Sequence, residues 1–125
     1  MGKSLEDQKR DWNELEFISW KEFQQMAPAI LQLEITRISR LLAAQPFDAD
    51  FHNALVAVRY QLKKFIEYLP NVEKDGVETA CAPHLNNALL NMPAPDALPD
   101  PALREILDYI TDRINYVLQR IKRIY

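Results

Sequence analysis

Glycine is nearly missing from this sequence: among 125 residues, only Gly2 and Gly76 are glycines. A β-sandwich or β-barrel usually needs more glycine at its turns, so an all-β fold is disfavoured. Two isolated glycines also cannot form a glycine-rich phosphate-binding loop, and the sequence contains neither a dinucleotide-binding fingerprint nor a nucleophile elbow. The common motifs of nucleotide binding and of serine hydrolysis are therefore excluded.

Cysteine and histidine are scarce as well. Cys81 is the only cysteine, which rules out an intrachain disulfide and a cysteine-based zinc site. The two histidines, His52 and His84, form neither a Glu-x-x-His nor a His-x-x-x-His pattern of metal ligands. We therefore expect no metal, no cofactor and no enzymatic activity. Cys81 is expected to be a small buried residue, and His52 to lie at the surface.

Long apolar runs and an excess of positive charge are missing too. No stretch approaches the ~18 apolar residues that a membrane-spanning helix requires, and the charged start at 1–6 lacks the apolar core of a signal peptide. The net charge is −3 and the isoelectric point is near 5.4, whereas a nucleic-acid-binding domain usually has a strongly basic face. These features predict a cytoplasmic protein with no membrane association, for which nucleic acid is not the expected partner.

What the sequence does contain is the composition of an ordinary globular domain. Hydrophobic residues make up 48% of the chain and charged residues 26%, and the length is that of one domain. Roughly two-thirds of the surface of an unfolded chain this long is buried on folding. We therefore predict that residues 1–125 form a single domain with a real core.

Apolar residues recur in steps of three and four, the spacing of one helix face, in three long segments. The first begins after Ser19, which forms a capping box with Glu22, and ends at 44–45. Pro28 lies within it and predicts a kink or a restart of the helix near Ala27, because proline removes a backbone donor.

The other two long helices have equally clear ends. The second begins after Asp48 or Asp50, either of which can cap it, and runs to 69. The third begins after Asp100, with Pro101 at the first helical position, and carries basic residues in its last turn, which complements the helix dipole.

Shorter segments connect or precede these helices. Residues 5–18 read as a short helix, so that 1–18 form a peripheral N-terminal element that docks on the domain or projects from it. A polar loop at 71–78 leads to a short helix at 79–92, and a proline-rich, extended connector follows at 93–100. The sequence therefore predicts an all-α bundle of about four helices, three long and one or two short, with the order of packing left open by the connector.

One acidic residue lies where apolar residues are expected. Glu34 falls near the centre of the apolar face of the first long helix, and Arg37 falls at the edge of the same face. A carboxylate in a core is costly unless it is paired. Three interpretations stay open for this buried polar pair: local neutralisation at a helix boundary, contact with a partner or second subunit, or a ligand site in the bundle.

Aromatic and basic residues form two further candidate sites. The aromatic candidates for a protein interface are Trp12, Phe17, Trp20 and Phe23, since tryptophan is favoured at interfaces; alternatively, these rings seal one end of the bundle. Near the C-terminus a weak basic patch consists of Arg113, Arg120, Lys122 and Arg123. It can touch phosphates, but Asp108 and Asp112 balance it, which favours a solvated helix face.

These observations favour a non-enzymatic protein–protein interaction module, such as an adaptor, assembly factor, inhibitor or immunity-type protein. The partner is another protein or a second copy of the chain. Two alternatives from other classes stay open. One is an accessory subunit of a nucleic-acid-associated complex that uses the basic end of the last helix. The other is a small-molecule binder that uses the bundle core near Glu34 and Arg37.

Overall fold

The computed structural model describes residues 15–94 and 98–125. Most of the predicted helix at 5–18 lies outside these residues. The part that lies inside, 15–18, is not helical, so the prediction is wrong there. Ile18 instead forms an isolated β-bridge with Ile124.

Within the described residues all regular secondary structure other than that bridge is helical, which confirms the predicted all-α class. Two short 3₁₀ turns, Leu69–Asn71 and Lys74–Gly76, connect the helix that ends at Tyr68 to the one that begins at Val77. The α-helices are α2 (Trp20–Ala44), α3 (Ala49–Tyr68), the single turn α4 (Val77–Ala80), α5 (Ala82–Asn91) and α6 (Pro101–Ile121).

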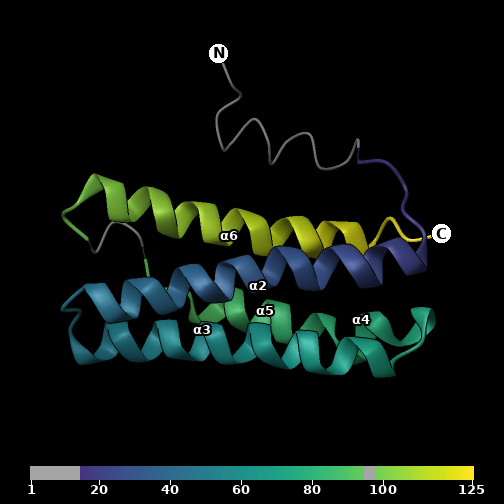
Figure 1. Ribbon diagram of the computed structural model, residues 1–125, viewed down its shortest axis with the longest axis horizontal. Helices are drawn as coiled ribbons and strands as arrows, with labels where there is room; N and C mark the ends of the chain where they lie inside the picture. Colours follow the sequence, from purple (N-terminus) through teal and green to yellow (C-terminus); the bar gives the residue numbers. More distant parts are fainter. Residues whose placement is uncertain (1–14, 95–97) are drawn as a thin grey trace, which may run out of the picture.

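Successive helices of the bundle run in opposite directions (Figure 1). Helices α2 and α5 run one way, while α3 and α6 run the other. Each of α2 and α5 packs against both α3 and α6, so the four helices close into a ring. The packing order that the connector had left open is therefore the up-down-up-down order of a four-helix bundle. No described helix is both long and apolar enough to cross a membrane.

The predicted caps hold the starts of the three long helices. Ser19, Asp48 and Asp100 each accept a hydrogen bond from a backbone N–H of the first turn, at 3.1, 2.8 and 2.9 Å. The Ser19 hydroxyl also donates to the Glu22 carboxylate at 2.9 Å. Caps of this kind contribute about 0.5–2 kcal/mol each to stability.

The apolar stripes meet inside the ring and form one core. Its members come from every helix of the bundle, in the spacing that the sequence predicts. The fully buried residues at its centre include Phe23, Leu31 and Ile38 from α2, Leu55, Leu62 and Phe65 from α3, Leu85 from α5, and Leu107, Ile110 and Ile114 from α6.

Pro28 does not divide α2, so of the two predicted outcomes, a kink or a restart near Ala27, the restart is wrong. The helix continues through Pro28 from Trp20 to Ala44. Proline lacks the N–H that would bond the carbonyl four residues earlier, that of Gln24. Burial of the apolar face on both sides of Pro28 holds the helix together at this point, as tertiary packing usually outweighs local propensity.

The predicted polar loop and short helix are also arranged differently. Residues 74–80 form a 3₁₀ turn and the single turn α4, and the predicted helix at 79–92 is broken at Cys81, which is buried. Helix α5 has 10 residues and α3 has 20, so α5 is about 15 Å long beside a helix of about 30 Å. Met92 and Leu98, which lie beyond the end of α5 and before the start of α6, also pack on the core.

We predict that Leu62→Ala and Ile114→Ala each lower the free energy of unfolding by about 2–5 kcal/mol, because each leaves a cavity in the core. Leu90→Ala is the matched control, since Leu90 is 82% exposed, and it should change stability by less than about 0.5 kcal/mol. Chemical denaturation monitored by circular dichroism measures all three. Equal effects at Leu62 and Leu90 would contradict the core assignment.

We also predict that Pro28→Ala raises the free energy of unfolding by about 1–3 kcal/mol, because alanine restores the N–H that the Gln24 carbonyl lacks. Pro101→Ala serves as the control. Pro101 occupies the first turn of α6, where no intrahelical bond is recovered, so its replacement should not stabilise the protein. Thermal unfolding measures the stability of both variants. A Pro28→Ala variant that is no more stable than the wild type would contradict the prediction.

Candidate functional site

The two segments that flank α2 and α6 lie side by side at one end of the bundle (Figure 1). Because α2 and α6 are antiparallel neighbours, the start of α2 meets the end of α6. Ile18 N–H donates to the Arg123 carbonyl at 2.8 Å, and Tyr125 N–H donates to the Ile18 carbonyl at 3.0 Å. This parallel bridge fixes aromatic and basic side chains from both segments in one place.

The structure separates the four aromatic residues that the sequence proposed as an interface. Trp12 lies outside the described residues. Phe23 is fully buried in the core, so its assignment to an interface is wrong. Trp20 is partly buried and stacks on Phe23, with ring centroids 5.9 Å apart and planes 13° from parallel, so it seals the end of the bundle. Only Phe17, which is 61% exposed, presents its ring to solvent.

The basic residues near the C-terminus are not a simple solvated face. Arg113 and Arg120 both lie over the ring of Tyr116, at 5.0 and 5.4 Å from the ring centroid. Arg120 also donates from Nε to the Tyr116 hydroxyl at 3.1 Å and from Nη1 to the Glu16 carbonyl. These contacts hold arginines of α6 in place against aromatic rings and against the segment before α2.

Arg123 and Lys122 complete the predicted basic patch. Arg123 lies over the Phe17 ring at 5.7 Å, while Lys122 is exposed beyond the end of α6. Asp112, which was expected to balance these charges at the surface, is buried. The expectation of a solvated acid at this position is therefore wrong.

A pattern that sequence reasoning missed links these residues. Tyrosine and arginine alternate along α6 in steps of four, three and four, the spacing of one helix face. We call the set that consists of Tyr109, Arg113, Tyr116 and Arg120 on α6 and Arg123 in the turn after α6 the Tyr–Arg stripe. The spacing was readable from the sequence, but only its basic members were noticed there, and the two tyrosines were not.

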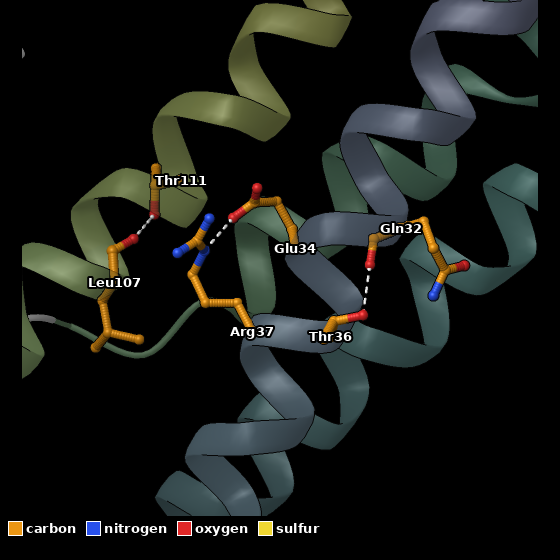
Figure 2. Close-up of polar contacts among 6 residues, drawn as sticks. All are labelled: Gln32, Glu34, Thr36, Arg37, Leu107 and Thr111. Atoms are coloured by element: carbon orange, nitrogen blue, oxygen red, sulfur yellow. Dashed lines mark hydrogen bonds and ion pairs between the residues drawn. The ribbon is translucent and has the colours of Figure 1, made fainter.

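The polar pair of α2 lies at the far end of this stripe. Arg37 Nε donates to Glu34 Oε1 at 2.9 Å, and the Arg37 guanidinium lies over the Tyr109 ring at 4.7 Å. Figure 2 shows the guanidinium reaching from α2 toward α6. All three groups of candidate residues from the sequence therefore contribute to one face of the α2–α6 pair.

Glu34 is 1% exposed, which confirms that the pair is buried at its acidic end. Burial raises the pKa of the Glu34 carboxyl above its ordinary value of 4.5, and the bond to Arg37 and the charges of Arg37 and Arg113 only partly offset this. The hydroxyls of Thr36 and Thr111 do not donate to the Glu34 carboxylate, because each donates to a carbonyl of its own helix (Figure 2). The ionised pair therefore costs stability rather than providing it.

The histidines and the cysteine fit structural roles. His52 is exposed, as expected. His84 Nδ1 lies 2.7 Å from Gln61 Oε1, and its ring packs against Tyr68 at 5.2 Å. Burial raises the pKa of the Cys81 thiol, as is usual for an inert structural cysteine.

We predict that the pH dependence of stability carries the signature of Glu34. A carboxyl with a raised pKa in the folded state binds its proton more tightly there than in the unfolded chain. Its contribution to stability is therefore complete below 4.5 and is lost as the pH rises through the raised pKa. Glu34→Gln, which keeps an acceptor for Arg37, should remove this loss when unfolding is measured from acid to neutral pH.

The control for this prediction is Glu73→Gln, a change at an exposed carboxylate, which should follow the wild-type curve. A Glu34→Gln curve parallel to that of the wild type would contradict the assignment.

The face between α2 and α6 thus combines arginines, aromatic rings and a buried acid. In the described part of the chain, no three His, Cys, Asp or Glu side chains are placed to hold a metal ion. No model of a protein family, no curated protein and no solved structure matches this chain. Its function must therefore be inferred from the chemistry of this face.

Proposed function

We propose that the protein is a protein–protein interaction module that binds an acidic segment of its partner along the Tyr–Arg stripe. The observation that carries this proposal is the alternation of tyrosine and arginine on α6, with each arginine held against an aromatic ring. Tyrosine and arginine are enriched among the residues that dominate binding energy at protein interfaces.

The stacking matters because it reduces the cost of binding. An arginine side chain loses rotamer freedom when it engages a partner, at a cost of about 0.5–1.5 kcal/mol. Arg113 and Arg120 already lie on Tyr116, and Arg120 is also bonded to the segment before α2. Much of this ordering is therefore complete before a partner arrives.

Charge favours a protein over a nucleic acid as the partner. The chain carries a net charge of −3, and one arginine of this face, Arg37, is already paired with Glu34. A protein that binds a phosphate backbone usually has a strongly basic face, which the net negative charge of this chain does not favour. Separate carboxylates on a partner helix or loop can meet single arginines, and the exposed Phe17 ring adds apolar contact beside Arg123.

The proposal is tested by placing the photoreactive residue benzoylphenylalanine at position 17 or 109 of the full chain. Phe17 and Tyr109 are both exposed and lie at opposite ends of the face. We expect irradiation in native cells to give the same cross-linked protein from both positions. Mass spectrometry identifies whether it is an acidic protein or a second copy of the chain.

Leu90, exposed on α5, is the control position and should not give this product. Replacing Arg113 and Arg123 by Gln should lower the yield at position 17 several-fold, because the charges that hold the acidic segment are lost. The same product from position 90, or cross-links to nucleic acid alone, would overturn the proposal.

A further inference from the structure

The strongest unexplained feature outside the stripe is the outer edge of Arg37. Its Nε is bonded to Glu34, and its plane lies on the Tyr109 ring. Its two terminal nitrogens make no hydrogen bond or ion pair within the described residues, although the side chain is only 40% exposed. Two parallel N–H donors on that edge have the geometry that binds a carboxylate through both oxygens.

Arg37 also lines an open, shallow cleft between α2 and α6. The cleft has a volume of about 480 Å³ and is lined by Arg37, Ala102, Glu105, Ile106 and Tyr109. Its wall on α6 is mostly apolar, with the Tyr109 ring beside Ile106. A cationic edge at one side of an apolar surface suits a ligand that has one carboxylate and an apolar body.

Glu105 narrows the choice of ligand further. Its carboxylate lies in the lining of the same cleft, so a second negative charge on the ligand would be repelled, whereas an N–H donor beside the carboxylate would be accepted. The cleft therefore disfavours dicarboxylates and phosphates. It favours a monocarboxylate such as the C-terminal residue of a peptide with an apolar side chain.

The buried Glu34–Arg37 pair orients the guanidinium before a ligand binds. Glu34 is buried and its Oε1 lies 2.9 Å from Arg37 Nε, so Glu34 anchors the guanidinium. By binding Arg37 through Nε, it holds the guanidinium with its outer edge directed away from the acid. A preorganised receptor of this kind avoids the loss of side-chain freedom on binding.

We propose that the α2–α6 cleft is a binding site for an apolar monocarboxylate, with Arg37 as the receptor of the carboxylate. The two sources of this chemistry are a peptide C-terminus and an aliphatic acid. The site shares Tyr109 with the Tyr–Arg stripe, but it uses none of the arginines of the stripe, so it does not depend on the partner proposed above.

Nuclear magnetic resonance of the full chain tests the site with three probes: N-acetylphenylalanine, its amide, and octanoate. We expect N-acetylphenylalanine to shift the signals of Ala102, Ile106, Tyr109 and the Arg37 Nε–H saturably. The amide has the same body without the charge and should bind at least tenfold more weakly. Tighter binding of octanoate than of N-acetylphenylalanine assigns the site to aliphatic acids, and the reverse assigns it to peptide C-termini.

Two variants separate the receptor from a general charge effect. Arg37→Lys keeps a cation beside Glu34 but lacks the two parallel donors, and Tyr109→Leu removes the stacked ring at an exposed position. Each should weaken N-acetylphenylalanine binding at least tenfold, while Arg40→Lys, at an exposed arginine one turn further along α2, should leave it unchanged. Equal binding of acid and amide, equal weakening by Arg40→Lys, or no shift with any probe would overturn the site. Loss of cross-linking when Arg113 and Arg123 are replaced by Gln would leave the proposed monocarboxylate site unaffected.

Discussion

The polar face of this bundle depends on one electrostatic constraint: the buried carboxylate of Glu34 needs a cation beside it. Moving a charge from water into a protein interior costs several kcal/mol, at about the scale of the whole stability of a small domain. Arg37 supplies the cation through Nε. The guanidinium held by that bond also lies over the ring of Tyr109 on the neighbouring helix, and Arg37 lines the cleft. One buried acid therefore positions groups on two helices.

Helix α6 has two different faces that lie next to each other. One contributes buried apolar residues to the core, and the adjacent one carries the Tyr–Arg stripe. Packing of the first face against α2 and α5 determines where the second one lies. Because α2 is antiparallel to α6, its central turns bring Arg37 to Tyr109, and the segment before it brings Glu16 and Phe17 to Arg120 and Arg123.

The parts of the structure that were predictable from the sequence are those decided by neighbours along the chain. The caps at Ser19, Asp48 and Asp100 and the apolar stripes are local, and the structure confirms them. Residues 15–18 were misread because a bridge to Ile124 outweighs helix propensity there, and Pro28 was misread because burial on both sides holds α2 together. Burial of Glu34 followed from its place on the apolar face. Burial of Asp112 and the stacking of Arg37 on Tyr109 depend on which helix lies opposite, and that information is not local.

The bridge between the segment before α2 and the segment after α6 also bears on the order in which contacts form during folding. Glu16 and Arg120 are 104 positions apart in the chain, and closing so large a loop costs entropy that few contacts at the bridge can offset on their own. Contacts between successive helices close far shorter loops and form earlier. The bridge therefore assembles only after α2 and α6 have packed. Until the bridge forms, Glu16 and Phe17 are separated from Arg120 and Arg123, so this end of the surface is complete only in the folded domain.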